Sequence, residues 1–123
     1  GNGLAYLPAW DFNGIGEWNV KQGYQLKSAA QTSLDIEGVS IQPELCPIEI
    51  LSGWNIISYL RQTPANAGEV FEDVITDIVI IKNSAGLAYL PEWDFNGIGD
   101  LLVGQGYQVK TSTDIELFYL AND

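Results

Sequence analysis

The sequence contains one 25-residue stretch twice, at residues 3–27 and at residues 86–110. The two stretches are offset by 83 positions and differ at six of their 25 positions, so 19 residues are identical. Such close self-similarity indicates that one structural unit has been duplicated. The residues that precede the second stretch have no counterpart before the first. We therefore expect a half copy at residues 1–41, a connector at residues 42–53 and a full copy at residues 54–123.

Two arrangements would cover the apolar residues of the half copy. Its strands could pack against the full copy in one core, across a pseudo-twofold axis, or they could complete a preceding unit of the same kind. A three-stranded piece of about 45 residues buries too little apolar surface to be stable alone. We therefore expect residues 1–123 to form a single compact domain with one shared core.

Several segments alternate apolar and polar residues, a pattern that is typical of half-buried strands. In the half copy and the connector, we predict strands at residues 4–7, 23–27, 34–41 and 48–50. In the full copy, we predict strands at residues 54–60, 78–82, 87–90, 106–110 and 115–120. The glycines and prolines between these segments favour turns, so neighbouring strands are expected to be mostly antiparallel.

One segment is predicted to be helical. Thr63 is a candidate N-cap, and Pro64 suits the first helical position because its missing N–H is not needed there. From Val70 to Ile78 the apolar residues recur at helical spacing and form one stripe, opposed by acidic residues. The predicted fold class is β-rich α+β: a small β-barrel or β-sandwich of duplicated strand units with one amphipathic helix at about residues 64–77.

The charge of the chain limits its partners. Sixteen acidic and five basic residues give a net charge of −11, which disfavours binding to nucleic acid and to anionic lipid surfaces. No apolar run approaches the roughly 20 residues that cross a bilayer, so we expect no membrane insertion. The chain has no histidine and a single cysteine, Cys46, which excludes an internal disulfide and a Cys/His zinc site. We expect Cys46 to be a buried, apolar side chain.

No motif in the chain points to catalysis, and we predict that the protein is not an enzyme. Hydrolysis by paired carboxylates needs a set separation and one raised pKa in an apolar pocket. Pairs such as Glu92 and Asp94 are expected as solvated surface groups in so acidic a chain. The Gly-x-Gly steps at residues 97–99 and 104–106 lack the remainder of a phosphate-binding loop.

The two Asp-Phe-Asn-Gly-Ile-Gly loops, at residues 11–16 and 94–99, are the best candidates for a chemical site. Oxygen-bearing side chains at alternate positions before a glycine resemble calcium loops. The candidate calcium ligands are Asp11, Asn13, Glu17, Asp94, Asn96 and Asp100. The match is partial, because isoleucine occupies the position of a third ligand and no bidentate glutamate follows. The alternative is a turn held by asparagine hydrogen bonds, without any cofactor.

Aromatic residues recur beside these loops and suggest a ligand-binding surface. Exposed aromatic rings with neighbouring amides commonly bind sugars, since the ring stacks on the apolar face of the sugar while its hydroxyls find polar partners. The candidate ligand-binding residues are Tyr6, Trp10, Asn13, Tyr89, Trp93 and Asn96. The alternative is that the aromatic rings pack in a β-rich core. Trp54 is a weaker candidate, because its neighbours are typical of a strand.

The order of these motifs resembles a known type of module. Gly53-Trp54-Asn55, an amphipathic helix and then Gly104-Gln105-Gly106-Tyr107-Gln108-Val109-Lys110 are similar to the Gly-Trp-Asn... Gly-x-Gly-Tyr-x-hydrophobic-Lys repeat modules of large bacterial and archaeal secreted or cell-surface proteins, including marine Bacteroidetes ones. The resemblance covers residues 53–120 fully and residues 3–41 in part. Val20 and Val103 stand where many of these modules have proline.

The resemblance implies a role and a location. Such modules usually lie beside adhesion, immunoglobulin-like or sorting domains and have no assigned catalytic residues. We therefore expect a non-catalytic structural or binding module of a larger extracellular or cell-surface protein, whose partners are other domains of that protein. The alternative is a module that binds carbohydrate or a small ligand through its loop aromatics, with calcium as a candidate aid.

Overall fold

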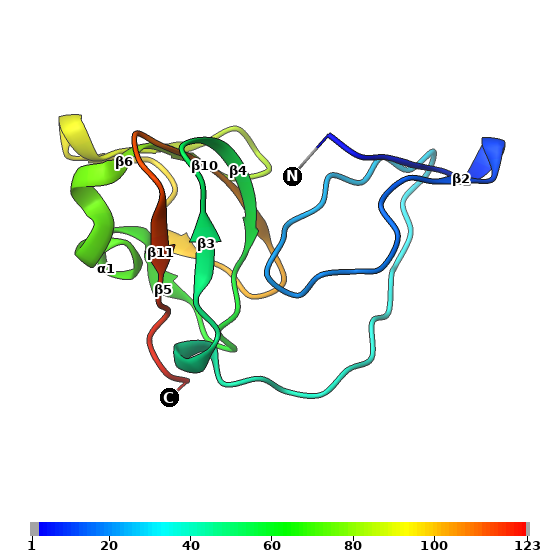
Figure 1. Ribbon diagram of the computed structural model, residues 1–123, viewed down its shortest axis with the longest axis horizontal. Helices are drawn as coiled ribbons and strands as arrows, with labels where there is room; N and C mark the ends of the chain where they lie inside the picture. The colour runs from blue at the N-terminus through cyan, green and yellow to red at the C-terminus, as the bar shows by residue number, and fades with distance from the viewer. Residues whose placement is uncertain (1–2, 123) are drawn as a thin grey trace.

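The computed structural model describes residues 3–122 and is rich in β-structure (Figure 1). Residues 43–120 form the compact part, in which a five-stranded sheet, two short sheets and a helical segment pack together. Residues 3–42 run beside it as a long open loop that carries a small hairpin at its far end (Figure 1). Within the described residues, no helix has the length and apolarity needed to cross a membrane.

The main sheet has the strand order β4-β10-β6-β7-β8, and all its neighbouring strands are antiparallel. Its strands are β4 (Gly53–Ser58), β6 (Ile78–Lys82), β7 (Ala88–Leu90), β8 (Phe95–Asn96) and β10 (Gly106–Thr111). Because β4 and β6 both pair with β10 in antiparallel fashion, they are parallel to each other. The helical segment between them is therefore a crossover connection.

Two short sheets complete the compact part. One pairs β3 (Ile48–Ile50) with β11 (Ile115–Leu117), and the other pairs β5 (Ala65–Asn66) with β9 (Asp100–Leu101). A third pair, β1 (Tyr6–Leu7) and β2 (Phe12–Asn13), forms the hairpin of the open loop. None of the sheets among the described residues closes into a barrel. The fold is thus β-rich α+β, with several small antiparallel sheets.

The helical segment begins later than the sequence predicts. It consists of α1 (Ala67–Val70) followed by the 3-10 helix η3 (Glu72–Asp77). The predicted cap at Thr63 is wrong: the cap is Asn66, whose side-chain oxygen accepts a hydrogen bond from the backbone N–H of Gly68 at 2.9 Å. The start is delayed because β5, which includes the cap residue Asn66, pairs with β9 and holds the chain extended.

The hydrophobic core lies between the main sheet and the helical segment. Its buried apolar residues all lie between Ile48 and Tyr119. Phe71, at the end of α1, is fully buried, and Val74 and Ile75 pack against the core from η3, so the predicted apolar stripe faces the sheet as expected. The sequence predicts one core built from both copies, whereas the buried apolar residues of the core come from the full copy and the connector.

The half copy lacks two strands that the sequence predicts. Residues 23–27 and 34–41 have no strand structure, and Leu26, Leu34 and Ile36 are exposed. The pattern of alternating residues is present, but a strand needs a neighbour to receive its backbone hydrogen bonds. These two predictions are wrong: contact with β4 ends at a bridge at Gln22 and one hydrogen bond from Gly23, and the described residues show no strand paired with the rest of either stretch.

The connector differs from the prediction at its cysteine. Residues Pro43–Leu45 form the 3-10 helix η2, and the backbone N–H of Cys46 donates to the carbonyl of Pro43 at 3.1 Å to cap it. Cys46 is partly exposed, so it is not the buried side chain that we expected. The position after η2 leaves the thiol at the surface, while the buried contacts of the connector come from Pro43 and β3.

Candidate functional site

The most distinctive surface features are two hairpins that share one backbone design. In the half copy, β1, the 3-10 helix η1 (Pro8–Trp10) and β2 form the first. In the full copy, β7, the 3-10 helix η4 (Pro91–Trp93) and β8 form the second. Each 3-10 helix starts at a proline, which presets the backbone angle of its first residue. We call these segments the first and second aromatic hairpin.

Two backbone constraints fix the shape of each hairpin. Asp11 and Asp94 end the 3-10 helices in the left-handed region, with φ angles of 48° and 50°. The backbone N–H of Gly14 donates to the carbonyl of Ala5 at 2.8 Å, and Gly97 makes the equivalent bond at 2.8 Å. A Cβ atom at Gly97 would lie 2.8 Å from the carbonyl oxygen of Ala88, so only glycine allows this closure.

The asparagine side chains brace the end of each loop. Asn96 accepts hydrogen bonds through its side-chain oxygen from the backbone N–H groups of Ile98 at 3.1 Å and of Gly99 at 2.8 Å. Asn13 accepts in the same way from the N–H of Gly16 at 2.8 Å. These oxygens are turned into the loop, which is the asparagine-braced turn that we considered as the alternative to calcium.

The acidic candidates for calcium binding are not gathered around these asparagines. The described residues contain no group of three or more acidic, histidine or cysteine side chains arranged to hold a metal ion. Asp100 lies in β9, opposite Asn66, where it continues a strand pair. Asp11 and Asp94 are exposed at the ends of their 3-10 helices. Calcium ligation by these loops stays a prediction that a melting experiment can test.

The aromatic candidates divide into exposed and buried side chains. Trp10 and Trp93 are 79% and 75% exposed, so each hairpin presents its tryptophan to solvent. Tyr6 is 53% exposed, whereas Tyr89 is only 8% exposed and belongs to the core. Tyr89 therefore packs in the core, as the alternative for the aromatic residues has it, and its part in a ligand surface stays a prediction.

A second surface was underrated by the sequence analysis. Trp54 in β4 is half exposed, and the Nζ atoms of Lys82 and Lys110 lie 5.6 and 5.8 Å from the centre of its ring. A groove of about 250 Å³ adjoins it and is also lined by Asn55 and Gln108. The alternation of residues 106–111 could have revealed part of this surface, since it places Gln108 and Lys110 on one face.

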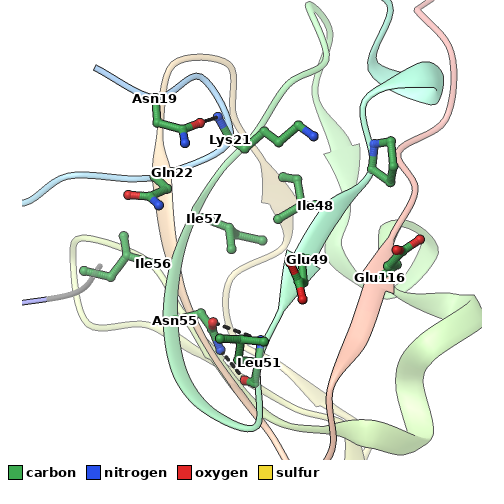
Figure 2. A pocket seen from close by; sticks show the side chains of 11 residues that line it. Asn19, Lys21, Gln22, Ile48, Glu49, Leu51, Asn55, Ile56, Ile57 and Glu116 are labelled. Carbon is green, nitrogen blue, oxygen red and sulfur yellow. Dashed lines mark hydrogen bonds between the residues drawn. The ribbon is translucent and has the colours of Figure 1, made fainter. Parts of the chain in front are cut away.

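A larger cavity lies where the open loop crosses the compact part (Figure 2). Its volume is about 460 Å³, and Lys21 of the half copy, Ile56 of β4 and Glu49 of β3 contribute to its lining. Figure 2 also shows the side chain of Asn55 hydrogen-bonded to the backbone of Leu51, with an Nδ2···O distance of 2.7 Å. The cavity therefore depends on the position of the open loop as well as on the sheet.

Two carboxylates of this cavity face each other across neighbouring strands. Glu49 and Glu116 lie opposite each other on β3 and β11, and both are exposed. Lys21 reaches the same cavity from the other side (Figure 2). Like charges opposite each other on neighbouring strands are unfavourable, so a cationic group between them would stabilise the pair. The arrangement can accommodate a cation-bearing side chain.

No family model, no curated protein and no solved structure matches this chain.

Proposed function

We propose that this protein is a non-catalytic binding module of a larger extracellular or cell-surface protein, and that Trp10 and Trp93 contact its partner. The extracellular location rests on the resemblance of residues 53–120 to modules of secreted proteins. The partners that follow from it are other domains of the same protein. The acidic surface, with a net charge of −11, suits partners that are neutral or basic.

The proposal rests mainly on the exposure of Trp10 and Trp93, which is similar although only one of the two hairpins belongs to the main sheet. The second aromatic hairpin is part of the main sheet, whereas the first lies outside the core, yet Trp93 and Trp10 are both largely exposed. Phe95 and Phe12 behave in the same way. Full integration into the sheet therefore does not cover these rings, so their apolar surface is free for a partner.

The rigid backbone of each hairpin favours a role of its exposed tryptophan in binding a partner. A ring that is held on a rigid loop loses little conformational entropy when it binds. Three features fix each hairpin: a proline starts its 3-10 helix, the backbone N–H of a glycine bonds across it, and an asparagine side chain accepts a hydrogen bond from the loop. Gly97 and Asn96 make these bonds in the second aromatic hairpin. Two such platforms on one chain suit weak binding to a partner with repeated sites, because linked contacts raise the overall affinity.

The test compares the unfolding of tryptophan variants. We expect Trp10→Ala, Trp93→Ala and the double variant to change the free energy of unfolding by less than about 0.5 kcal/mol, because the rings are exposed. A loss of more than about 1 kcal/mol would show that the rings pack structurally and would overturn the proposal. Trp18→Ala is a matched control, since Trp18 is also exposed but stacks on Tyr24 with ring centres 4.0 Å apart.

Carbohydrate binding is the second candidate function, and the surface around Trp54 favours it. A half-exposed ring with lysine and amide side chains around it offers both stacking and polar contacts for a sugar, and Lys82 and Lys110 favour an anionic one. A glycan array with the full chain, Trp54→Ala and the Trp10/Trp93 double variant separates the candidates. Binding lost only with Trp54→Ala assigns the sheet groove, and an array without any signal rejects carbohydrate binding.

A further inference from the structure

The half copy already contains the local structure of a complete unit. The hydroxyl of Tyr24 accepts a hydrogen bond from the backbone N–H of Asn19 at 2.8 Å, and Tyr107 makes the same contact with Leu102 at 2.7 Å. The aromatic hairpins also match, down to the bond closed by Gly14 and Gly97. All these contacts join residues less than about ten positions apart, so they need no partner segment.

The half copy lacks the long-range partners that the full copy obtains from one segment. Residues 48–82 supply every strand that pairs with residues 86–117, apart from the aromatic hairpin itself. They provide β4 and β6 to β10, β6 to β7, β5 to β9 and β3 to β11. The backbone N–H of Ala67 adds a hydrogen bond to the carbonyl of Gly99 at 2.9 Å.

The missing partners leave apolar surface exposed. Val109 is 0% exposed, whereas its counterpart Leu26 is 79% exposed. Leu101 is buried, whereas its counterpart Trp18 is exposed. The residues of the full copy at the same positions are covered by residues 48–82, so a segment of that type would cover Leu26 and Trp18 as well.

The motif that follows β10 extends the match. Thr111-Ser112-Thr113-Asp114-Ile115-Glu116 leads into β11, and Thr32-Ser33-Leu34-Asp35-Ile36-Glu37 follows the first copy with four extra residues before it. Ile115 is partly buried against the core, while Ile36 is exposed. The half copy therefore spans residues 3–37 at least, and it includes an unpaired equivalent of β11.

The proportion of the segments within residues 1–123 argues against another copy of these same residues as the partner that completes the half copy. Each chain holds one segment of the residue 48–82 type and two stretches that could receive it, the half copy and residues 86–117. In any assembly of such chains the receiving stretches outnumber the segments by two to one. If residues 48–82 moved to the half copy of another chain, they would leave residues 86–117 of some chain without their partner strands.

We propose that residues 3–37 are an interaction surface for a second segment of the residue 48–82 type, which enters as strand, strand, helix and strand and completes a second unit. The near-identity of residues 3–27 and 86–110 means that this segment would meet the same residues as it does in the full copy. The mode is β-strand addition with a helix that covers the new core. The inference is independent of the ligand proposed for Trp10 and Trp93.

Part of the surface has a contact that completion must accommodate. The backbone N–H of Gly23 donates to the carbonyl of Ile56 at 3.1 Å, at the outer edge of β4. A Cβ atom at Gly23 would lie 2.6 Å from the side chain of Ile56 and 3.2 Å from the Cα atom of Gly106. The equivalent glycines of the two copies thus meet here. This contact involves only the first of residues 23–27, and no backbone hydrogen bond joins residues 24–27 to β4.

The test grafts a second copy of residues 48–85 directly ahead of Gly3 in the full chain, which reproduces the spacing found ahead of Gly86. We expect the amides of residues 23–27 to exchange with solvent at least about 100-fold more slowly by hydrogen-exchange mass spectrometry, because they become part of a core sheet. The amides of residues 106–110 should keep their protection, since two segments now serve two receiving stretches.

A matched control carries Ile57→Asp and Ile81→Asp in the grafted copy only. Both isoleucines are buried in the native unit, and they lie opposite Tyr107 and Tyr89 on neighbouring strands. Protection of residues 23–27 that is unchanged by the graft, or equal with the control graft, would overturn the inference. Loss of protection at residues 106–110 would also overturn it, because it would mean that the two stretches compete.

Discussion

Tyr6 and Tyr89 provide a matched test of where the core lies. They occupy the same position in the two aromatic hairpins and form equivalent cross-strand pairs, with Asn13 and with Asn96. Tyr89 is a core residue, whereas Tyr6 is more than half exposed. Replacing each by alanine removes the same side chain from the same local structure. The difference between the variants therefore reports the packing of the sheet alone.

The size of the effect follows from the buried area. An aromatic side chain buries about 150 to 250 Å², and burial contributes about 25 cal/mol per Å², which gives roughly 4 to 6 kcal/mol as an upper figure for Tyr89→Ala. Measured losses for large aromatic-to-alanine changes in cores are about 3 to 5 kcal/mol. Since a domain of this size is stable by about 5 to 15 kcal/mol, this is a major loss. We expect Tyr6→Ala to cost less than about 0.5 kcal/mol.

The measurement is urea unfolding of the full chain followed by near-UV circular dichroism, which reports the packing of buried aromatic rings. Tyr89→Phe is the control, because it keeps the ring and should retain most of the stability. Equal midpoints for Tyr6→Ala and Tyr89→Ala would refute the reasoning, since they would mean that both copies contribute equally to one cooperative core. A larger loss for Tyr6→Ala would refute it as well.

Three further predictions concern the hairpin, the pH and calcium. Gly97→Ala should lower the free energy of unfolding by about 1 to 3 kcal/mol, because its Cβ atom meets a backbone carbonyl, while Gly14→Ala should leave core unfolding in urea unchanged. Burial raises the pKa of Tyr119 in the folded protein above its unfolded value of about 10. The contribution of this tyrosine to the free energy of unfolding is therefore complete below about pH 10 and is lost as the pH rises further. Melting temperatures should fall above about pH 10, and they should fall less steeply in Tyr119→Phe. Calcium and chelator should leave the melting temperature unchanged, because the Asn96 oxygen is already bonded within its loop; a rise of several degrees with calcium would restore the metal hypothesis.

The sequence predicts the full copy well because each of its strand and helix patterns has a neighbouring element to pack against. The strands at residues 54–60, 78–82 and 106–110 are present as β4, β6 and β10; the bounds of β6 agree, β4 spans residues 53–58 and β10 ends one residue later than predicted. The apolar stripe of the helical segment faces the core. In each case the periodic pattern finds a packed neighbour, so local preference and tertiary contact favour the same structure.

The predictions fail where a strand pattern has no neighbouring strand to pair with, or where a contact joins residues that are distant in the sequence. Residues 34–41 alternate as a strand does but remain without regular structure. The approach of Lys82 and Lys110 to the ring of Trp54 depends on the pairing of three strands, which no local pattern specifies. The same limit applies to Tyr89, because an aromatic residue beside a turn can lie above or below the sheet.

The two copies separate what local sequence determines from what a partner determines. With 19 of 25 residues in common, both form the hairpin closed by glycine and the turn closed by a tyrosine hydroxyl, and their bond lengths agree. Only the copy that is preceded by residues 48–82 becomes a sheet with a core. Because Trp93 remains exposed in that completed sheet, completion of the half copy should leave Trp10 exposed too. The graft experiment and the tryptophan variants can therefore fail independently.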